Sequence, residues 1–146
     1  MNENMKFFVD TNIFFYLMIK DKNNTPIAER TMKYALEKGD VYTSTHVLFE
    51  FVRTLEYRAK RASEMREKFA KAFEGLINFI ELAEIKVLSV DYNDIKNAMK
   101  INVKEMNFGD KLCIAIMERE GIKYILSADK AYDKAKNVIR IWLSES

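Results

Sequence analysis

The chain has 146 residues, of which 49% are apolar and 32% charged, with four Gly, one Pro and one Cys. This composition excludes disordered, collagen-like and disulfide-stapled proteins, and it predicts one compact domain spanning residues 1–146. The lone Cys113 indicates a reducing compartment, and the longest apolar run, residues 13–19, is much shorter than the ~20 residues of a membrane span. We therefore expect a soluble cytoplasmic protein.

The net charge of +2 is unevenly distributed. Residues 53–71 carry seven basic and three acidic side chains, a local charge of +4, which leaves −2 for the rest of the chain. Two interpretations stay open at this point: a solvated helix face with internal ion pairs, or a surface that binds a polyanion.

Strand and helix patterns alternate along the chain. The predicted strands span residues 6–10, 40–43, 85–90, 123–127 and 138–142. The predicted helices between them span residues 12–20, 25–39, 45–59, 63–83, 91–103 and 109–120. The polar stretch 57–67 has no apolar stripe and predicts a mobile helical hairpin.

Several helix boundaries carry capping signals. Thr25 predicts the N-cap of the second helix, with a proline in the first turn, and Gly39 predicts its end. Asp91 and Asp94 predict a capping box, and Gly121 ends the last helix.

The predicted strands are mostly continuous in apolar character, which is typical of strands covered on both faces in a parallel sheet. Alternating strands and helices are the pattern of right-handed βαβ crossovers. The sequence therefore predicts an α/β fold with helices on both faces of a parallel sheet.

Four acidic residues are candidates for a functional site. Asp10 and Asp129 follow the first and fourth predicted strands, and ligands bind beyond the carboxyl ends of strands in open α/β sheets. Asp110 begins a helix, and for all three aspartates the alternative role is a helix N-cap. Glu50 lies inside a helix, about 60° outside its apolar stripe, so it is either solvated or part of a cleft.

Few other residues in the sequence are suited to catalysis. We assign the only histidine, His46, to a helix start, and Cys113 lies in an apolar run. The sequence has neither a Gly-rich phosphate loop nor a Cys/His cluster with zinc spacing. Any chemistry therefore depends on carboxylates, and converging carboxylates need a hard cation such as Mg²⁺ or Mn²⁺. Such a cation activates water for attack on a phosphate.

The order of these acids resembles the PIN-domain family of metal-dependent nucleases, many of which are VapC-type toxins of prokaryotic toxin–antitoxin pairs. The resemblance covers residues 6–142 and rests on FVDTN at 8–12, Glu50, GD at 109–110 and SADKAY at 127–132. It implies a five-stranded parallel sheet of order 3-2-1-4-5. It also implies a metal site of Asp10, Glu50, Asp110 and Asp129, supported by Asn12 and Ser127, with Tyr132 in place of a usual aromatic residue.

Two residues depart from the family pattern. Lys111 stands where the family usually has a small residue, and we expect it to point away from the site. Asp133 is an additional acid, for which we expect capping or solvation, with a water-mediated role left open.

The leading hypothesis is an endoribonuclease that uses Mg²⁺ or Mn²⁺. Its expected RNA contacts are Arg53, Arg58, Lys60 and Arg61, and its expected partners are RNA, an antitoxin and a second copy of the chain. The apolar residues compatible with a dimer interface are Phe14, Phe15, Leu17, Met18, Met32 and Leu36, although core packing explains most of them.

Three alternatives remain. A haloacid-dehalogenase-like phosphatase is disfavoured, because Asn12 stands where its second aspartate belongs. A non-catalytic RNA- or protein-binding module on the same scaffold would receive a partner's arginine in its acidic pocket. The third alternative is a free-standing PIN nuclease that acts in RNA processing.

Overall fold

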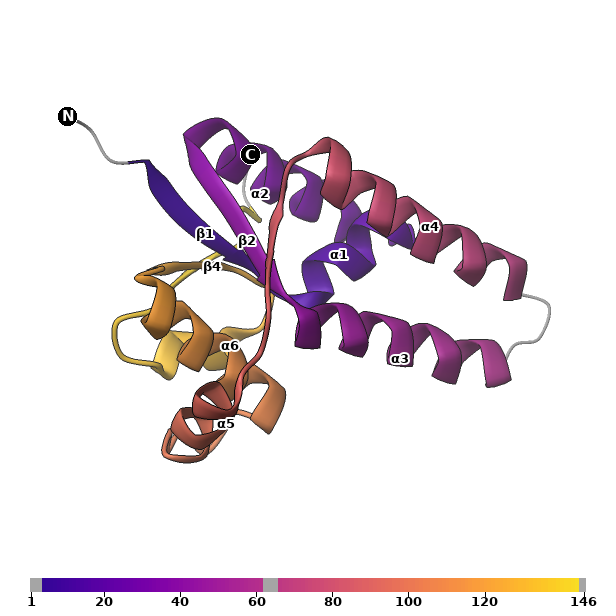
Figure 1. Cartoon of the computed structure of the whole chain (residues 1–146). Coiled ribbons are helices and arrows are strands. Elements are labelled where there is room, and N and C mark those ends of the chain that lie inside the picture. Colours follow the sequence, from indigo (N-terminus) through magenta and orange to yellow (C-terminus); the bar gives the residue numbers. More distant parts are fainter. Residues whose placement is uncertain (1–3, 62–65, 145–146) are drawn as a thin grey trace.

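The computed structural model describes residues 4–61 and 66–144, which form a parallel sheet flanked by helices (Figure 1). Its elements in chain order are β1 (Met5–Val9), α1 (Thr11–Met18), α2 (Thr25–Lys38), β2 (Gly39–Ser44), α3 (Thr45–Arg61), α4 (Arg66–Leu82), β3 (Lys86–Leu88), α5 (Tyr92–Met99), α6 (Phe108–Glu120), β4 (Tyr124–Leu126), the 3₁₀ helix η2 (Lys130–Lys134) and β5 (Ile139–Ile141). Among these residues, no helix has the length and apolarity needed to cross a membrane.

The five strands lie in the order β3-β2-β1-β4-β5, and all neighbouring pairs are parallel. This order confirms the predicted fold class. After β1 the chain continues on the side of β2, and it later crosses to β4 on the other side of β1. The carboxyl ends of β1 and β4 therefore meet where the winding direction changes, which is where open α/β sheets bind ligands.

Helices cover both faces of the sheet. In Figure 1, α1, α2 and α4 lie on one side, α5 and α6 lie on the other, and α3 extends beyond the carboxyl ends of the strands. The β1 side chains Phe7, Phe8 and Val9 are fully buried, as expected for a central strand covered on both faces.

The predicted helix boundaries need several corrections. Thr25 is not an N-cap: Asn24 takes that position, and the Thr25 hydroxyl instead donates to the Tyr16 carbonyl 2.7 Å away. The helix expected to reach residue 103 ends at Met99. The capping box of Asp91 and Asp94 is confirmed, as is the end of α6 at Gly121, whose φ of 69° is left-handed. The expected hairpin over 57–67 includes residues 62–65, which lie outside the described part of the chain.

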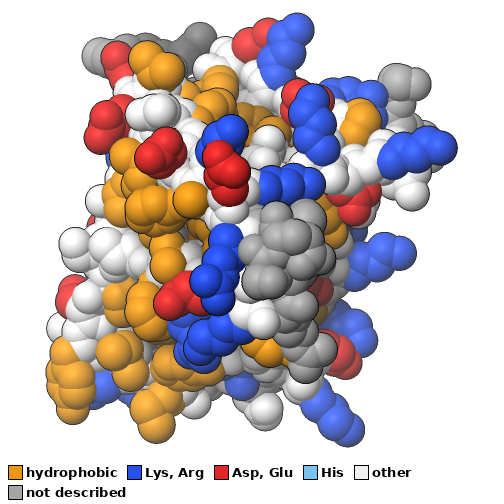
Figure 2. All heavy atoms as spheres, turned by 90° about the vertical axis from the view of Figure 1, so that its right-hand side faces the viewer, with side chains coloured by type: hydrophobic (Ala, Val, Ile, Leu, Met, Phe, Trp, Pro, Cys, Tyr) orange, Lys and Arg blue, Asp and Glu red, His pale blue; other side chains and the backbone are white. Residues whose placement is uncertain are grey.

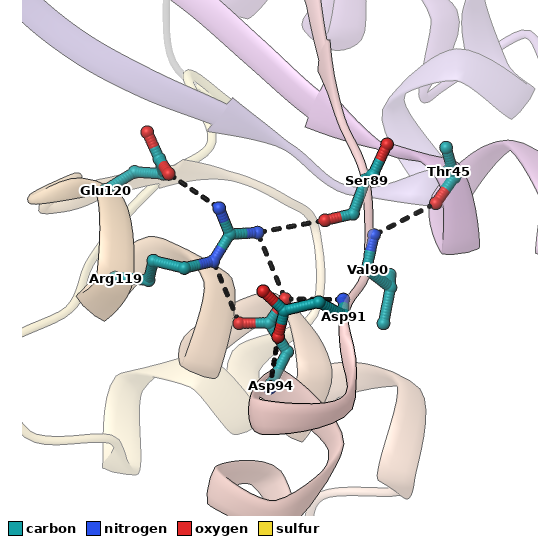
Figure 3. Close-up of polar contacts among 7 residues, drawn as sticks. All are labelled: Thr45, Ser89, Val90, Asp91, Asp94, Arg119 and Glu120. Atoms are coloured by element: carbon teal, nitrogen blue, oxygen red, sulfur yellow. Dashed lines mark hydrogen bonds and ion pairs between the residues drawn. The ribbon is translucent and has the colours of Figure 1, made fainter.

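An ion pair between a buried carboxylate and a partly exposed guanidinium joins α5 to α6 (Figure 3). Asp94 of α5 is only 1% exposed, and Arg119 of α6 donates to its two carboxylate oxygens at 2.9 and 3.0 Å. Arg119 also donates to the Ser89 carbonyl, so the chain leaving β3 is held by the same guanidinium. Because Asp94 is desolvated, its charge depends on this partner.

We expect Arg119→Met to lower the free energy of unfolding by about 3 kcal/mol, because it leaves the Asp94 carboxylate buried without its cation. Lys134→Met is the matched control: it breaks the exposed pair with Glu105 and is expected to cost less than ~1 kcal/mol. Urea unfolding of both variants measures the difference. Equal losses would contradict a structural role for the buried pair.

Candidate active site

The four predicted acids line one pocket of about 310 Å³ at the carboxyl edge of the sheet. They come from four separate segments: the end of β1, the middle of α3, the first turn of α6 and the segment after β4. The full lining is Asp10, Thr11, Asn12, Phe15, Tyr16, Glu50, Thr54, Arg58, Asp110 and Asp129.

Asp10 is the most enclosed of the four, at 6% exposure. One carboxylate oxygen caps α1 by accepting from the Thr11 amide at 2.9 Å. The other accepts from Ser127 Oγ at 2.8 Å and from Asn12 Nδ2 at 3.1 Å. Asp10 is therefore both a helix cap and a pocket residue.

Asn12 and Ser127 join the ends of β1 and β4. The Asn12 amide donates to Ser127 Oγ at 2.9 Å, and its oxygen accepts from the Ala128 amide at 3.0 Å. Ser127 Oγ also accepts from the Asp129 amide at 3.0 Å. These two residues thus fix the positions of Asp10 and the Asp129 backbone relative to each other.

Glu50 is half-buried and leans toward the start of α6. Its Oε2 accepts from Thr11 Oγ1 at 3.1 Å. A Cβ atom added to Gly109 would overlap its Oε1, so only glycine leaves this carboxylate its place. Glu50 therefore lies in the cleft.

Asp110 lies in the first turn of α6 but does not cap it. Asn107 is the N-cap, and its side chain accepts from the Asp110 amide at 2.9 Å. The Asp110 carboxylate instead accepts from the hydroxyl of the buried Tyr132 at 3.1 Å. Asp129 is exposed at the rim and caps η2 through the Ala131 amide at 2.9 Å.

Burial and mutual repulsion perturb these acids. Burial, together with the charges of Asp110 and Glu50, raises the pKa of Asp10 to about 7 against the hydrogen bonds that favour its anion. Burial also raises the pKa of Glu50, with a contribution from Asp110, and the pKa of Asp110, with a contribution from Asp129. The charges of Glu50, Asp110 and Asp129 thus each make a neighbouring carboxyl harder to ionise, and a bound cation would reverse this effect.

The donor set fits a hard divalent cation. Within residues 4–61 and 66–144, no three His, Cys, Asp or Glu side chains are drawn together as a ready-made metal site. The pocket nevertheless offers carboxylate oxygens from four sides, and its lining contains neither histidine nor cysteine. Oxygen-only ligands suit Mg²⁺ or Mn²⁺ rather than Zn²⁺.

The two departures from the family pattern lie outside the pocket lining. Lys111 is half-buried, and Asp133 pairs with Arg140 at 3.0 Å. Of the predicted RNA contacts, which are exposed where described, Arg58 lines the pocket and lies 4.4 Å over the Phe15 ring, Arg53 lines a second hollow next to Glu50, and Lys60 lines neither. Arg61 ends α3, and its side chain is outside the described part of the structure.

Sequence reasoning did not assign four further residues to the site, although they help to shape the pocket. Thr11 orients Glu50, Gly109 leaves room for it, and Asn107 starts α6. The spacing of Asn107 three residues before Asp110 is a capping signal visible in the sequence. His46 hydrogen bonds to Ser44 and to the Gly109 carbonyl, a pairing that no local pattern encodes.

The PIN domain family model matches residues 7–138, so the chain belongs to the PIN domain family. No curated protein matches the sequence. Among solved structures, the chain is similar to VapC20 of Mycobacterium tuberculosis, described as a toxin that cleaves the sarcin-ricin loop, with 22% identity, a TM-score of 0.66 and coverage of 89% of this chain and 95% of that one.

Two toxin–antitoxin structures are also similar. VapBC2 from Rickettsia felis, bound to a DNA fragment of its promoter, has 14% identity and a TM-score of 0.66 over 94% of this chain and 99% of that one. A toxin–antitoxin complex from Klebsiella pneumoniae has 10% identity and a TM-score of 0.58 over 90% and 94%. At these identities the similarity shows a shared fold.

We expect the free energy of unfolding of the metal-free protein to fall as the pH rises from about 4 to about 7. The folded state keeps a proton on Asp10 that the unfolded chain has released, so this contribution is full below the unfolded pKa of 3.8 and is lost as the pH passes through the folded pKa of about 7. Glu50 and Asp110 act with the same sign. His46 acts with the opposite sign, because burial lowers its pKa and the unfolded chain binds a proton there that the folded state does not. Urea unfolding in EDTA between pH 4.5 and 8 measures this dependence.

Asp10→Asn is the control, because it has no proton to release and should flatten the pH dependence. A wild-type profile as flat as that of the variant would show that Asp10 ionises normally in the fold.

Proposed function

We propose that the chain is an endoribonuclease that hydrolyses RNA phosphodiester bonds with Mg²⁺ or Mn²⁺. The observation that carries this proposal is the convergence of Asp10, Glu50, Asp110 and Asp129 on one pocket at the switch point of a PIN fold. A divalent cation bound there would lower the pKa of a water molecule and offset the charge of the scissile phosphate.

The chain's own residues hold the carboxylates for this purpose. Asn12 and Ser127 fix Asp10, Thr11 directs Glu50, and Tyr132 directs Asp110. These hydrogen bonds fix the orientation of three of the four acids, and the carboxylates would have to draw closer together around a bound ion.

Arg58 is the best-placed residue for holding the RNA backbone. Among the described residues, Arg58 is the one basic side chain in the pocket lining, and its guanidinium stacks over the Phe15 ring. Figure 2, which faces the side where α3 and α4 project, shows further Lys and Arg side chains over this surface. We assign Arg53 and Lys60 to weaker phosphate contacts, which position a strand without reading its sequence, and Arg61, whose side chain lies outside the described part of the structure, stays a predicted RNA contact.

We further propose a toxin role with an antitoxin partner, supported by the similarity to VapBC complexes. Inhibition would follow if the antitoxin placed a basic side chain among the four acids. A homodimer through α1 and α2 also remains a proposal, and its residues need correction. Phe14 and Met32 are buried in the core and are unavailable to a partner, whereas Leu36 is 38% exposed.

We expect Asp110→Asn to reduce RNA cleavage by at least ~100-fold while leaving the fold intact, because the variant loses a metal ligand that does not cap its helix. The Mg²⁺- or Mn²⁺-induced rise in melting temperature should shrink with it. Asp133→Asn is the matched control, since that acid pairs with Arg140 outside the pocket, and it should cleave like the wild type. Cleavage of labelled RNA with and without Mn²⁺ measures both. Wild-type activity in Asp110→Asn would refute the metal site.

We expect Arg58→Gln to weaken RNA binding and to reduce the slope of log affinity against log salt by about one, as for the loss of one phosphate contact. Lys60→Gln removes the same charge two residues further along α3, outside the pocket lining, and should change the slope less. Binding is measured in EDTA, so that cleavage does not interfere. Equal effects would indicate a diffuse basic surface instead of a contact at the pocket.

A further inference from the structure

His46 is the only histidine of the sequence, and it lies outside the lining of the pocket, one helical turn before Glu50 on α3. Its Nδ1 hydrogen bonds to Ser44 Oγ, and its Nε2 lies 3.2 Å from the Gly109 carbonyl oxygen and 3.4 Å from Cys113 Sγ. The imidazole therefore connects the end of β2 with the first turn of α6.

The two partners define which nitrogen carries the proton. The Gly109 carbonyl is only an acceptor, so Nε2 must donate to it. Nδ1 of the neutral ring then accepts from the Ser44 hydroxyl, which is itself fully buried. Both ring nitrogens are occupied by neighbours within the fold, and neither is directed to a substrate in the pocket.

The hydrogen bond from His46 is made to Gly109, the residue whose position determines how far apart Glu50 and Asp110 lie. Gly109 precedes Asp110, and its missing side chain leaves the room that Glu50 Oε1 occupies. His46 and Glu50 lie one turn apart on α3, so they contact the same short segment of α6 from the same helix face. The distance between the two helices at this point sets the distance between Glu50 and Asp110.

We propose that His46 is a positioning residue that sets the spacing of the Glu50 and Asp110 carboxylates by holding the Gly109 main chain against α3. This inference rests on the proposed metal site for its consequence. If the bond is lost, α6 is free to shift relative to α3, and a cation would meet carboxylates at unequal distances.

Two substitutions separate the Gly109 bond from the rest of the side chain. Glutamine places its amide nitrogen near the position of Nε2, so His46→Gln keeps a donor for the Gly109 carbonyl. The shorter asparagine side chain in His46→Asn can still hydrogen bond to Ser44, but it does not extend to the Gly109 carbonyl. Isothermal titration with Mn²⁺ should therefore show affinity within about threefold of the wild type for His46→Gln, and at least about tenfold weaker affinity for His46→Asn.

Thr31→Val is the matched control for general loosening of the fold. It removes one hydrogen bond that a buried hydroxyl oxygen accepts from a distant main-chain donor, the Leu143 amide, at a residue outside the pocket lining. It should lower the free energy of unfolding in EDTA and leave Mn²⁺ affinity unchanged. A loss of affinity in Thr31→Val equal to that in His46→Asn would overturn the positioning role.

Gly109→Ala tests the same spacing from the other helix and remains informative if His46→Asn fails to fold. The added Cβ meets the far end of a flexible side chain and not the backbone, so the variant should fold normally, with Ala the better helix former. Its Mn²⁺ affinity should nevertheless fall by about tenfold, because Glu50 is displaced. Combined with His46→Asn, the loss should be smaller than the sum of the single losses, since both act on one spacing.

The outcomes distinguish this inference from the proposed function. A wild type that binds no Mn²⁺ overturns both. A wild type that binds Mn²⁺ together with a His46→Asn variant of equal affinity overturns only the role of His46. Equal weakening in His46→Gln and His46→Asn does the same, because it shows that the Gly109 bond is not the cause.

Discussion

The arrangement of the pocket depends on one constraint: the Asp10 carboxylate is buried at the junction of β1 and β4, among other carboxylates. Such a group is stable only if its oxygens are hydrogen bonded. Thr11, Asn12 and Ser127 provide these bonds, and the last two connect the central strands to each other. The polar contacts that make Asp10 tolerable therefore also define the geometry of the site.

This burial opposes stability in the absence of an ion. Desolvation and neighbouring charges raise the pKa of Asp10, so at neutral pH the metal-free fold bears a cost that a protonated or cation-bound carboxylate does not. The buried apolar side chains of β1 and the ion pair between Asp94 and Arg119 contribute to the stability of the fold through contacts that do not involve the Asp10 carboxylate. The acidic site is thus an electrostatic cost that the rest of the fold offsets.

Strand patterns in the sequence predicted a parallel α/β sheet, because such patterns are local signals, whereas the strand order and the four-acid site were implied by the resemblance to the PIN-domain family. Sequence reasoning failed where contacts are distant. Thr25 is a residue type that favours the N-cap position, yet its hydroxyl donates to the Tyr16 carbonyl, and Asn24 is the N-cap. His46 carries no local sign that its partner is Gly109, 63 residues away. Which residue packs against which across the fold is a tertiary property that periodicity does not encode.

The four acids also differ in how they are held, and this difference gives the site two halves. Asp10 follows β1 and caps α1, and Asp129 follows β4 and caps η2, in each case by accepting from a main-chain amide. The ends of the two strands therefore fix the positions of these two residues. Glu50 and Asp110 lie within α3 and α6, and side-chain hydroxyls direct their carboxylates. The first half follows from strand register, whereas the second follows from the packing of two helices. Small shifts between α3 and α6 would therefore change the second half while leaving the first in place, so under the proposed function adjustment to an ion or a substrate would fall to these helices.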